Sequence, residues 1–139
     1  GRVDVLPLNP SVFREADPLR LDLLDLLDDV AVGVGALLVA VQAAHPWMSA
    51  GARISATGSM AADEPWHRAA SLGVQKAGLR NLVISLDRTL EADGIRAVSV
   101  TVRGALSSEG TFTPDKVAAA ILAATRQDPH EWRAGVSSP

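Results

Sequence analysis

The sequence contains no cysteine and no tyrosine, and aromatic residues make up only 4% of its 139 residues. Without cysteine there can be no disulfide, thiol nucleophile or thiolate metal site. Without tyrosine, one of the side chains that act as general acids or bases is missing. His45, His67 and His130 are too scattered to suggest a metal cluster, so no metal site is predicted.

Long runs of one charge and long apolar runs are also missing. Thirteen basic and sixteen acidic residues give a net charge of -3, and no basic block interleaved with aromatic residues indicates a nucleic-acid surface. The apolar stretch 30–44 is shorter than the roughly 20 residues that a membrane helix needs, and no signal-peptide pattern is present. We therefore expect a cytoplasmic protein, folded as one small domain over residues 1–139, with no nucleic-acid or membrane partner.

Short β-branched runs alternate with helical patterns along the chain. Strands are predicted at 3–6, 53–57, 95–102 and around 132–136. Helices are predicted at 28–47, 68–92 and 115–126. This alternation predicts right-handed βαβ units and a parallel sheet covered by helices.

Residues that favour helix ends support these boundaries. Asp17 before Pro18 is expected to begin a short helix or helical turn that contains a group of leucines. Thr113 before a proline is expected to begin the last helix. Gly94 stands where a C-terminal cap of the second long helix is expected.

Several segments, in order, resemble the short-chain dehydrogenase/reductase family. The run Gly-Ala-Arg-Ile at 51–54 resembles the "GRIV" strand that leads to the family's catalytic serine, and Lys-Ala-Gly-Leu at 76–79 resembles its "YxxxKAGL" helix. Segments 1–6, 42–48 and 113–118 resemble the strand before the "NNAG" turn, the "QAALPHM" helix end and the "TPEDVA" helix. The resemblance implies the C-terminal half of the family's domain. That half is an α/β fold with a partial Rossmann-like, doubly wound parallel sheet of about four strands and flanking helices.

Counting positions aligns the family's catalytic residues with this sequence. Ser59 lies 13 positions before Leu72, and Lys76 lies four positions after it, which are the spacings between the family's serine, tyrosine and lysine. The resemblance therefore places Ser59 and Lys76 at retained catalytic positions and Leu72 at the tyrosine position. Tyrosine performs the acid–base step in that chemistry, and a leucine has no proton to give or take.

Other family positions have also changed. The asparagine of the long helix falls at Gly33, the "NNAG" turn corresponds to 8–11, and Gly104 is what remains of a proline–glycine pair. Asn9, Lys76 and Gly104 are the cofactor-binding candidates that the resemblance implies. The glycine-rich βαβ unit that holds a dinucleotide's pyrophosphate has no counterpart in this sequence. We expect no cofactor for the isolated chain, and NAD(P) if a partner supplies that half.

Two interpretations of several residues stay open. Ser59 and Lys76 could act together as nucleophile and base, or the serine could simply end a strand and the lysine lie on a solvated face. His67 could replace the tyrosine as acid–base, or lie in an exposed loop at 63–67. Arg103 could neutralise an anionic ligand, or lie at the surface where a strand ends.

These positions favour a catalytically degenerate family member that acts as an oligomerising structural or regulatory subunit. Helices 28–47 and 68–92 correspond to those that the family uses for association, and their small residues and leucines favour a homo-oligomer. One alternative is an NAD(P)-dependent oxidoreductase whose dinucleotide-binding half comes from another chain, as a heteromer. Another is a binding module with a small-molecule pocket near Ser59. In the chain alone the first strand is expected to be an unprotected sheet edge, which a second copy, an N-terminal-half partner or another partner would cover.

Overall fold

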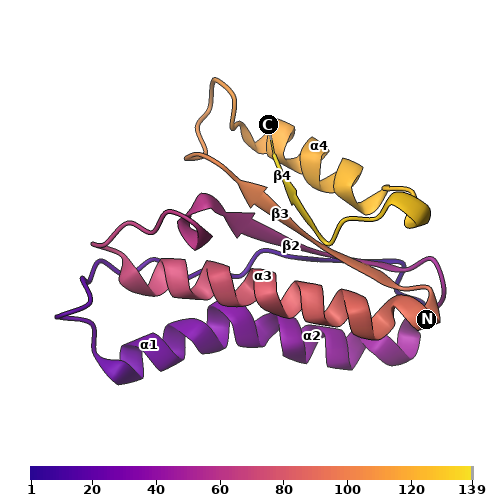
Figure 1. The fold of residues 1–139 in the computed structure, drawn as a ribbon, viewed down its shortest axis with the longest axis horizontal. Helices are drawn as coiled ribbons and strands as arrows, with labels where there is room; N and C mark the ends of the chain where they lie inside the picture. Colours follow the sequence, from indigo (N-terminus) through magenta and orange to yellow (C-terminus); the bar gives the residue numbers. More distant parts are fainter. Residues whose placement is uncertain (139) are drawn as a thin grey trace.

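A computed structural model describes residues 1–138 of the chain. Within them, the strands β1 (Val5–Leu8), β2 (Arg53–Ser59), β3 (Arg96–Val102) and β4 (Gly135–Ser137) form one parallel sheet in that order. Helices α1, α2 and α3 lie along one face of this sheet, and α4 lies on the other (Figure 1). The predicted α/β fold, a partial Rossmann-like parallel sheet with flanking helices, is confirmed.

The first helical region is longer than predicted. It runs without a break through α1 (Leu23–Val30), a π-helical turn (Ala31–Gly35), α2 (Ala36–Ala44) and a 3₁₀ turn (His45–Trp47). Its N-cap is Asp22, whose carboxylate accepts a hydrogen bond of 2.8 Å from the Leu24 amide. At Asp17 the structure has the helical turn of the two predicted forms: its carboxylate accepts from the Leu19 amide at 2.8 Å, and its carbonyl accepts from the Leu21 amide at 2.9 Å. Most of the leucines expected in that turn belong to α1 instead.

The other helix boundaries agree closely with the sequence patterns. The second long helix comprises α3 (Ala70–Leu90) and a 3₁₀ turn (Glu91–Asp93), and it ends at Gly94. Gly94 adopts a left-handed φ of 73°, which explains why glycine occupies this cap. Helix α4 (Pro114–Thr125) begins after Thr113, whose hydroxyl accepts from the Lys116 amide.

The two edge strands are displaced from their predicted positions. Strand β1 begins at Val5 because the preceding Val3 amide donates instead to the Trp47 carbonyl, at 2.8 Å. Strand β4 begins only at Gly135, since Asp128 caps a 3₁₀ turn and the Trp132 indole donates to the Ala97 carbonyl at 3.1 Å. A backbone contact before β1 and side-chain contacts before β4 thus hold the chain away from the sheet.

One of the three crossovers has an unexpected hand. The strand order always advances in the same direction, yet α4 lies on the face opposite α2 and α3 (Figure 1). The last connection therefore has the opposite hand to the first two, and the expectation of uniformly right-handed units is wrong. Segment 103–113, which follows β3, carries the chain to the other face.

A hydrophobic core lies on each face of the sheet. Between the sheet and helices α2 and α3, the largest core side chains include Leu37, Ile54 and Leu79, each 0% exposed. On the other face, Val98 and Val100 pack beneath α4. Strand β1 contributes only the partly buried Leu6 and Leu8 and leaves Val5 50% exposed, so it is the unprotected edge that the sequence predicted.

Candidate functional site at the carboxyl ends of β1 and β2

Ser59 is the last residue of β2 and lies at the carboxyl end of the sheet, where α/β proteins commonly bind ligands. Its hydroxyl oxygen accepts a hydrogen bond of 3.2 Å from the Ala61 amide and so caps a 3₁₀ turn (Met60–Ala62). The expectation that this serine ends a strand is confirmed. Its hydroxyl is partly buried and can still donate a hydrogen bond.

Lys76 reaches the same region from α3. Its ammonium group donates to the Thr57 carbonyl at 3.0 Å and to the Pro10 carbonyl at 3.5 Å. The residue is only 6% exposed, and this burial lowers the pKa of Lys76. The interpretation that placed the lysine on a solvated face is therefore wrong. Among the described residues it makes no hydrogen bond to Ser59.

Leu72 lies one helical turn before Lys76 on α3 and is half-buried. It supplies no donor, acceptor or titratable group at the position where the family places its tyrosine. The acid–base step of that family has no carrier at this position in this chain.

The asparagine position, Gly33, is occupied by a neighbouring side chain. Gly33 lies in the π-helical turn, and a Cβ added to it would lie 2.3 Å from Oε1 of Gln75. The Gln75 amide is fully buried and holds the backbone of Val12 at both ends: Oε1 accepts from the Val12 amide and Nε2 donates to its carbonyl, each at 3.0 Å. Glycine is therefore required here because Gln75 fills the space.

A buried ionic cluster next to this site was missed at the sequence level. Asp29, in α1, accepts two hydrogen bonds of 2.9 Å from the Arg14 guanidinium and one of 2.7 Å from the Ser71 hydroxyl. The hydrogen bonds from Arg14 are the main reason that the pKa of Asp29 lies below its ordinary value. The only hint in the sequence was an acidic pair at the start of an apolar helix. Like the two hydrogen bonds between Gln75 and Val12, this cluster fixes segment 9–16 against the helices.

The remaining cofactor candidates are engaged within the chain. Asn9 accepts a hydrogen bond from the Thr57 hydroxyl. Gly104 lies against the Phe112 ring, since a Cβ there would meet ring atoms at 2.3 Å. Asn9, Lys76 and Gly104, the cofactor-binding candidates, are thus each in contact with other parts of the chain.

His67 and Arg103 lie at the surface. His67 is exposed, and the segment 63–67 is exposed throughout, as the loop interpretation predicted. Arg103 is 47% exposed and donates to the Ser137 hydroxyl at 3.0 Å. Within residues 1–138 no cluster of acidic or histidine side chains suits a metal ion. None of the helices described combines the length and apolarity needed to cross a membrane.

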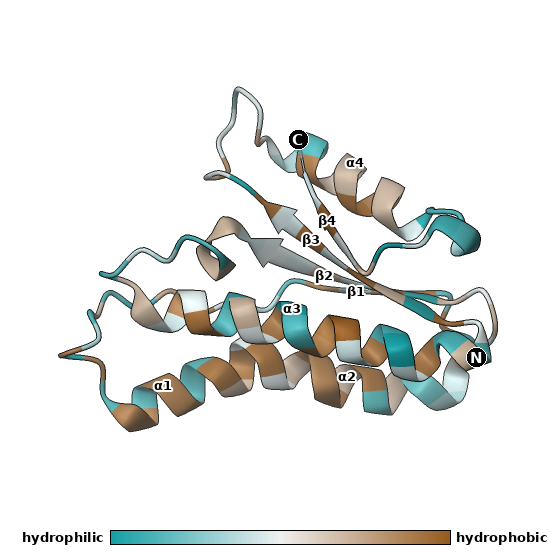
Figure 2. Cartoon of the chain, viewed as in Figure 1, coloured by the Kyte–Doolittle hydropathy of each residue, from teal (hydrophilic) through white to brown (hydrophobic). Residues whose placement is uncertain are grey.

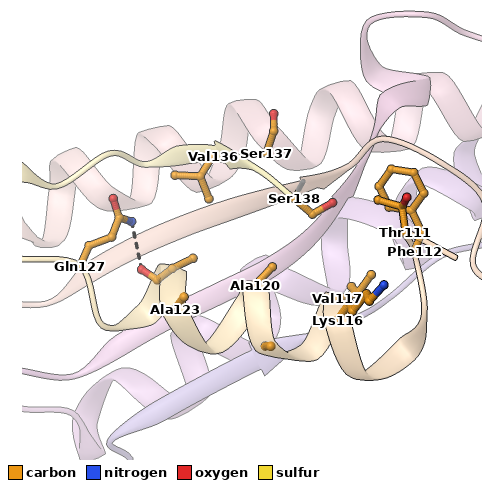
Figure 3. A pocket seen from close by; sticks show the side chains of 12 residues that line it. Thr111, Phe112, Lys116, Val117, Ala120, Ala123, Gln127, Val136, Ser137 and Ser138 are labelled. Carbon is orange, nitrogen blue, oxygen red and sulfur yellow. Dashed lines mark hydrogen bonds between the residues drawn. The ribbon is translucent and has the colours of Figure 1, made fainter.

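A separate cavity of about 720 Å³ lies between α4 and β4 (Figure 3). Alanines of α4 and Val136 of β4 form its walls, and Phe112 and Lys116 lie at one end. It contains neither Ser59 nor Lys76, so it is not part of the site at β1 and β2.

A parallel sheet with a serine and a buried lysine at its carboxyl end defines a Rossmann-like α/β protein. A family model described as enoyl-(acyl carrier protein) reductase matches residues 1–128. The chain belongs to the short-chain dehydrogenase/reductase family, to which these reductases belong.

Solved structures agree with this assignment. A short-chain dehydrogenase/reductase from Serratia marcescens is 28% identical and superposes on 99% of this chain and 64% of its own, with a TM-score of 0.84. A dehydrogenase/reductase from Sinorhizobium meliloti is 28% identical over 74% of this chain and 41% of its own, with a TM-score of 0.69. A metagenomic short-chain oxidoreductase in complex with NADP is 22% identical over 99% and 62%, with a TM-score of 0.81. The chain thus spans 64% or less of these relatives' length. No curated protein matches it.

Proposed function

We propose that this chain is a non-catalytic, oligomerising subunit of the short-chain dehydrogenase/reductase family with a structural or regulatory role. The observation that carries the proposal is Leu72, which stands where the acid–base tyrosine is required. Two contacts support it. Gln75 occupies the space beside Gly33, the asparagine position, and the Phe112 ring occupies the space beside Gly104, so both leave less room for the family's reactants.

The alternative is an NAD(P)-dependent oxidoreductase completed by a partner that supplies the dinucleotide-binding half. Lys76 favours it: a buried lysine with a lowered pKa is typical of a functional site. The relative in complex with NADP makes that nucleotide the cofactor to test. A binding module that keeps a pocket near Ser59 is the third possibility, and ligand binding there without redox activity would favour it.

We expect the 139-residue chain to give no saturable quenching of its tryptophan fluorescence when it is titrated with NADPH. Restoring the tyrosine with Leu72→Tyr is expected to leave NADPH oxidation with ketone substrates undetectable. The reason is that other side chains still occupy the space beside Gly33 and Gly104. A full-length NADP-binding relative serves as the positive control. Saturable binding by the unaltered chain would support the oxidoreductase alternative, and activity in Leu72→Tyr would show that only the tyrosine had been lost.

The outward surface of α1, α2 and the 3₁₀ turn that follows them supports oligomerisation. Large apolar side chains are exposed along it, including Leu24 at 69%, Val39 at 65% and Trp47 at 56% (Figure 2). An apolar groove of about 690 Å³ continues this surface between α1 and α3, next to Val74. Exposed apolar surface of this extent is typical of an interface. The predicted partner is a second copy of the chain, since helices 28–47 and 68–92 both contribute to the surface.

The edge of β1 is less suited to a partner strand. The Arg53 amide donates to the Asp4 carbonyl, so Leu6 and Leu8 hydrogen-bond with β2 while Val5 and Pro7 face the open side. Pro7 has no N–H, and a strand added there would lose one ladder hydrogen bond. This favours a homo-oligomer through the helices over a heteromer formed at this edge.

We expect Val39→Lys to shift the chain from dimer or larger oligomer to monomer in sedimentation velocity, because a desolvated ammonium opposes association. The matched control is Leu122→Lys on α4, which is 50% exposed on the opposite face. The control is expected to keep the mass of the unaltered chain. A monomeric unaltered chain, or equal effects of the two variants, would contradict the proposed interface.

A further inference from the structure

A polar cavity of about 640 Å³ lies over the exposed face of β4 and uses none of the residues discussed under the proposed function. Val136 packs with the core beneath α4, so its neighbours Gly135 and Ser137 point to the α3 side of the sheet. No atom lies within 4 Å of a Cβ position at Gly135, so the floor of the cavity is open. Three arginines line it, Arg80 from α3, Arg103 after β3 and Arg133 before β4.

The charges in this cavity do not balance. Asp63 is the only acidic side chain that lines it, and Arg80 already engages that carboxylate with two hydrogen bonds of 2.7 and 3.0 Å. Arg103 lies 3.8 Å from the same carboxylate and is 47% exposed. The Arg133 guanidinium forms no ion pair or side-chain hydrogen bond within residues 1–138. Three guanidinium groups thus share one carboxylate in this cavity, which leaves a net charge of two positive.

We propose that this cavity, formed by Arg103 and Arg133 above Gly135 with Arg80 fixed by Asp63, binds a small oxyanion, a phosphate group or a carboxylate. Guanidinium groups present pairs of N–H donors that match two oxygens of such a group. Arg80 and Asp63 form the rigid end of the site, and the Ser137 hydroxyl orients Arg103. The open floor at Gly135 leaves room for the anion itself.

The experiment is isothermal titration calorimetry of the full 139-residue chain with inorganic phosphate and, separately, with malonate, at low ionic strength and neutral pH. We expect saturable binding of one anion per chain. Arg133→Gln and Arg103→Gln are each expected to weaken it about tenfold, the effect of losing one charge-assisted contact. Arg126→Gln, which removes an exposed arginine of the same charge elsewhere, is expected to leave the affinity unchanged.

Gly135 offers a test that leaves the arginines in place. Gly135→Asp places a carboxylate on the open floor and is expected to abolish binding of either anion, while Gly135→Ala, the matched control, is expected to retain it. Preference for phosphate over malonate, or the reverse, identifies the source of the oxyanion. The proposal is overturned if the unaltered chain binds neither anion, or if Arg126→Gln weakens binding as much as Arg133→Gln. It is equally overturned if Arg133→Gln changes the oligomeric mass but not the affinity, which would make the cavity a protein interface.

Discussion

Replacing Asp29 by alanine is expected to lower the free energy of unfolding by about 3 kcal/mol. Its side chain is 2% exposed and joins three segments: Arg14 in the loop after β1, α1 itself, and Ser71 in α3. The alanine leaves the Ser71 hydroxyl buried without its acceptor and releases the loop. The effect lies at the low end of what breaking a buried pair costs, because Arg14 is 34% exposed and can reach water.

Urea denaturation of both proteins at neutral pH measures this difference. Asp28→Ala is the matched control, since Asp28 is the exposed neighbour in the same helix, and we expect it to stay within about 0.5 kcal/mol of the unaltered chain. If Asp29→Ala is no less stable than Asp28→Ala, the cluster contributes nothing. Should the alanine variant fail to fold, Asp29→Asn keeps the shape and reports the lost charge.

The same carboxylate makes stability depend on pH. Hydrogen bonds from Arg14 hold the pKa of Asp29 below 3.8, its ordinary value, so the unfolded chain takes up a proton at higher pH than the folded chain. Its contribution is complete above the unfolded pKa and is lost as the pH falls through the folded one. Asp63, whose pKa is lowered by Arg80, acts in the same direction. Stability should therefore fall less steeply below about pH 5 in Asp29→Asn than in the unaltered chain.

The sheet and the sequence positions of the candidate site residues were predictable because both depend on local patterns in the sequence. Strand β3 is a β-branched run, and the cap at Gly94 follows from a single residue type. Ser59 and Lys76 were placed by the resemblance to the family's motifs, whose spacing they share. No local pattern gave the burial of Lys76, because the Pro10 and Thr57 carbonyls that surround it come from two other segments.

The contacts that fill the site were not predictable for the same reason. Gln75 and Val12 are 63 residues apart, and Ser71 and Asp29 are 42 apart. Each of these residues is unremarkable in its own segment, and only the fold makes them partners. The hand of the last crossover also depends on which face α4 packs against, and alternation of strands and helices carries no information about that.

Placing asparagine at Gly33, as in the family pattern, is expected to destabilise the chain by about 1–3 kcal/mol, the usual cost of overpacking a core. The new Cβ would lie 2.3 Å from Oε1 and 2.7 Å from Cγ of Gln75. That side chain cannot withdraw without losing both hydrogen bonds to Val12. Gly35→Asn is the matched control, because it lies in the same π-helical turn with only the Val30 carbonyl, 4.0 Å away, near a Cβ.

The decisive measurement is the double variant Gly33→Asn with Gln75→Ser. Gln75→Ser alone is expected to destabilise the chain, because it empties a buried site and releases the Val12 backbone. In the double variant the shorter side chain makes room for the asparagine, so the combined loss should be smaller than the sum of the single losses by about 1 kcal/mol or more. Additive losses, or equal effects of Gly33→Asn and Gly35→Asn, would mean that Gln75 does not determine which residue position 33 accepts. Glycine at the asparagine position would then be a change independent of the packing around it.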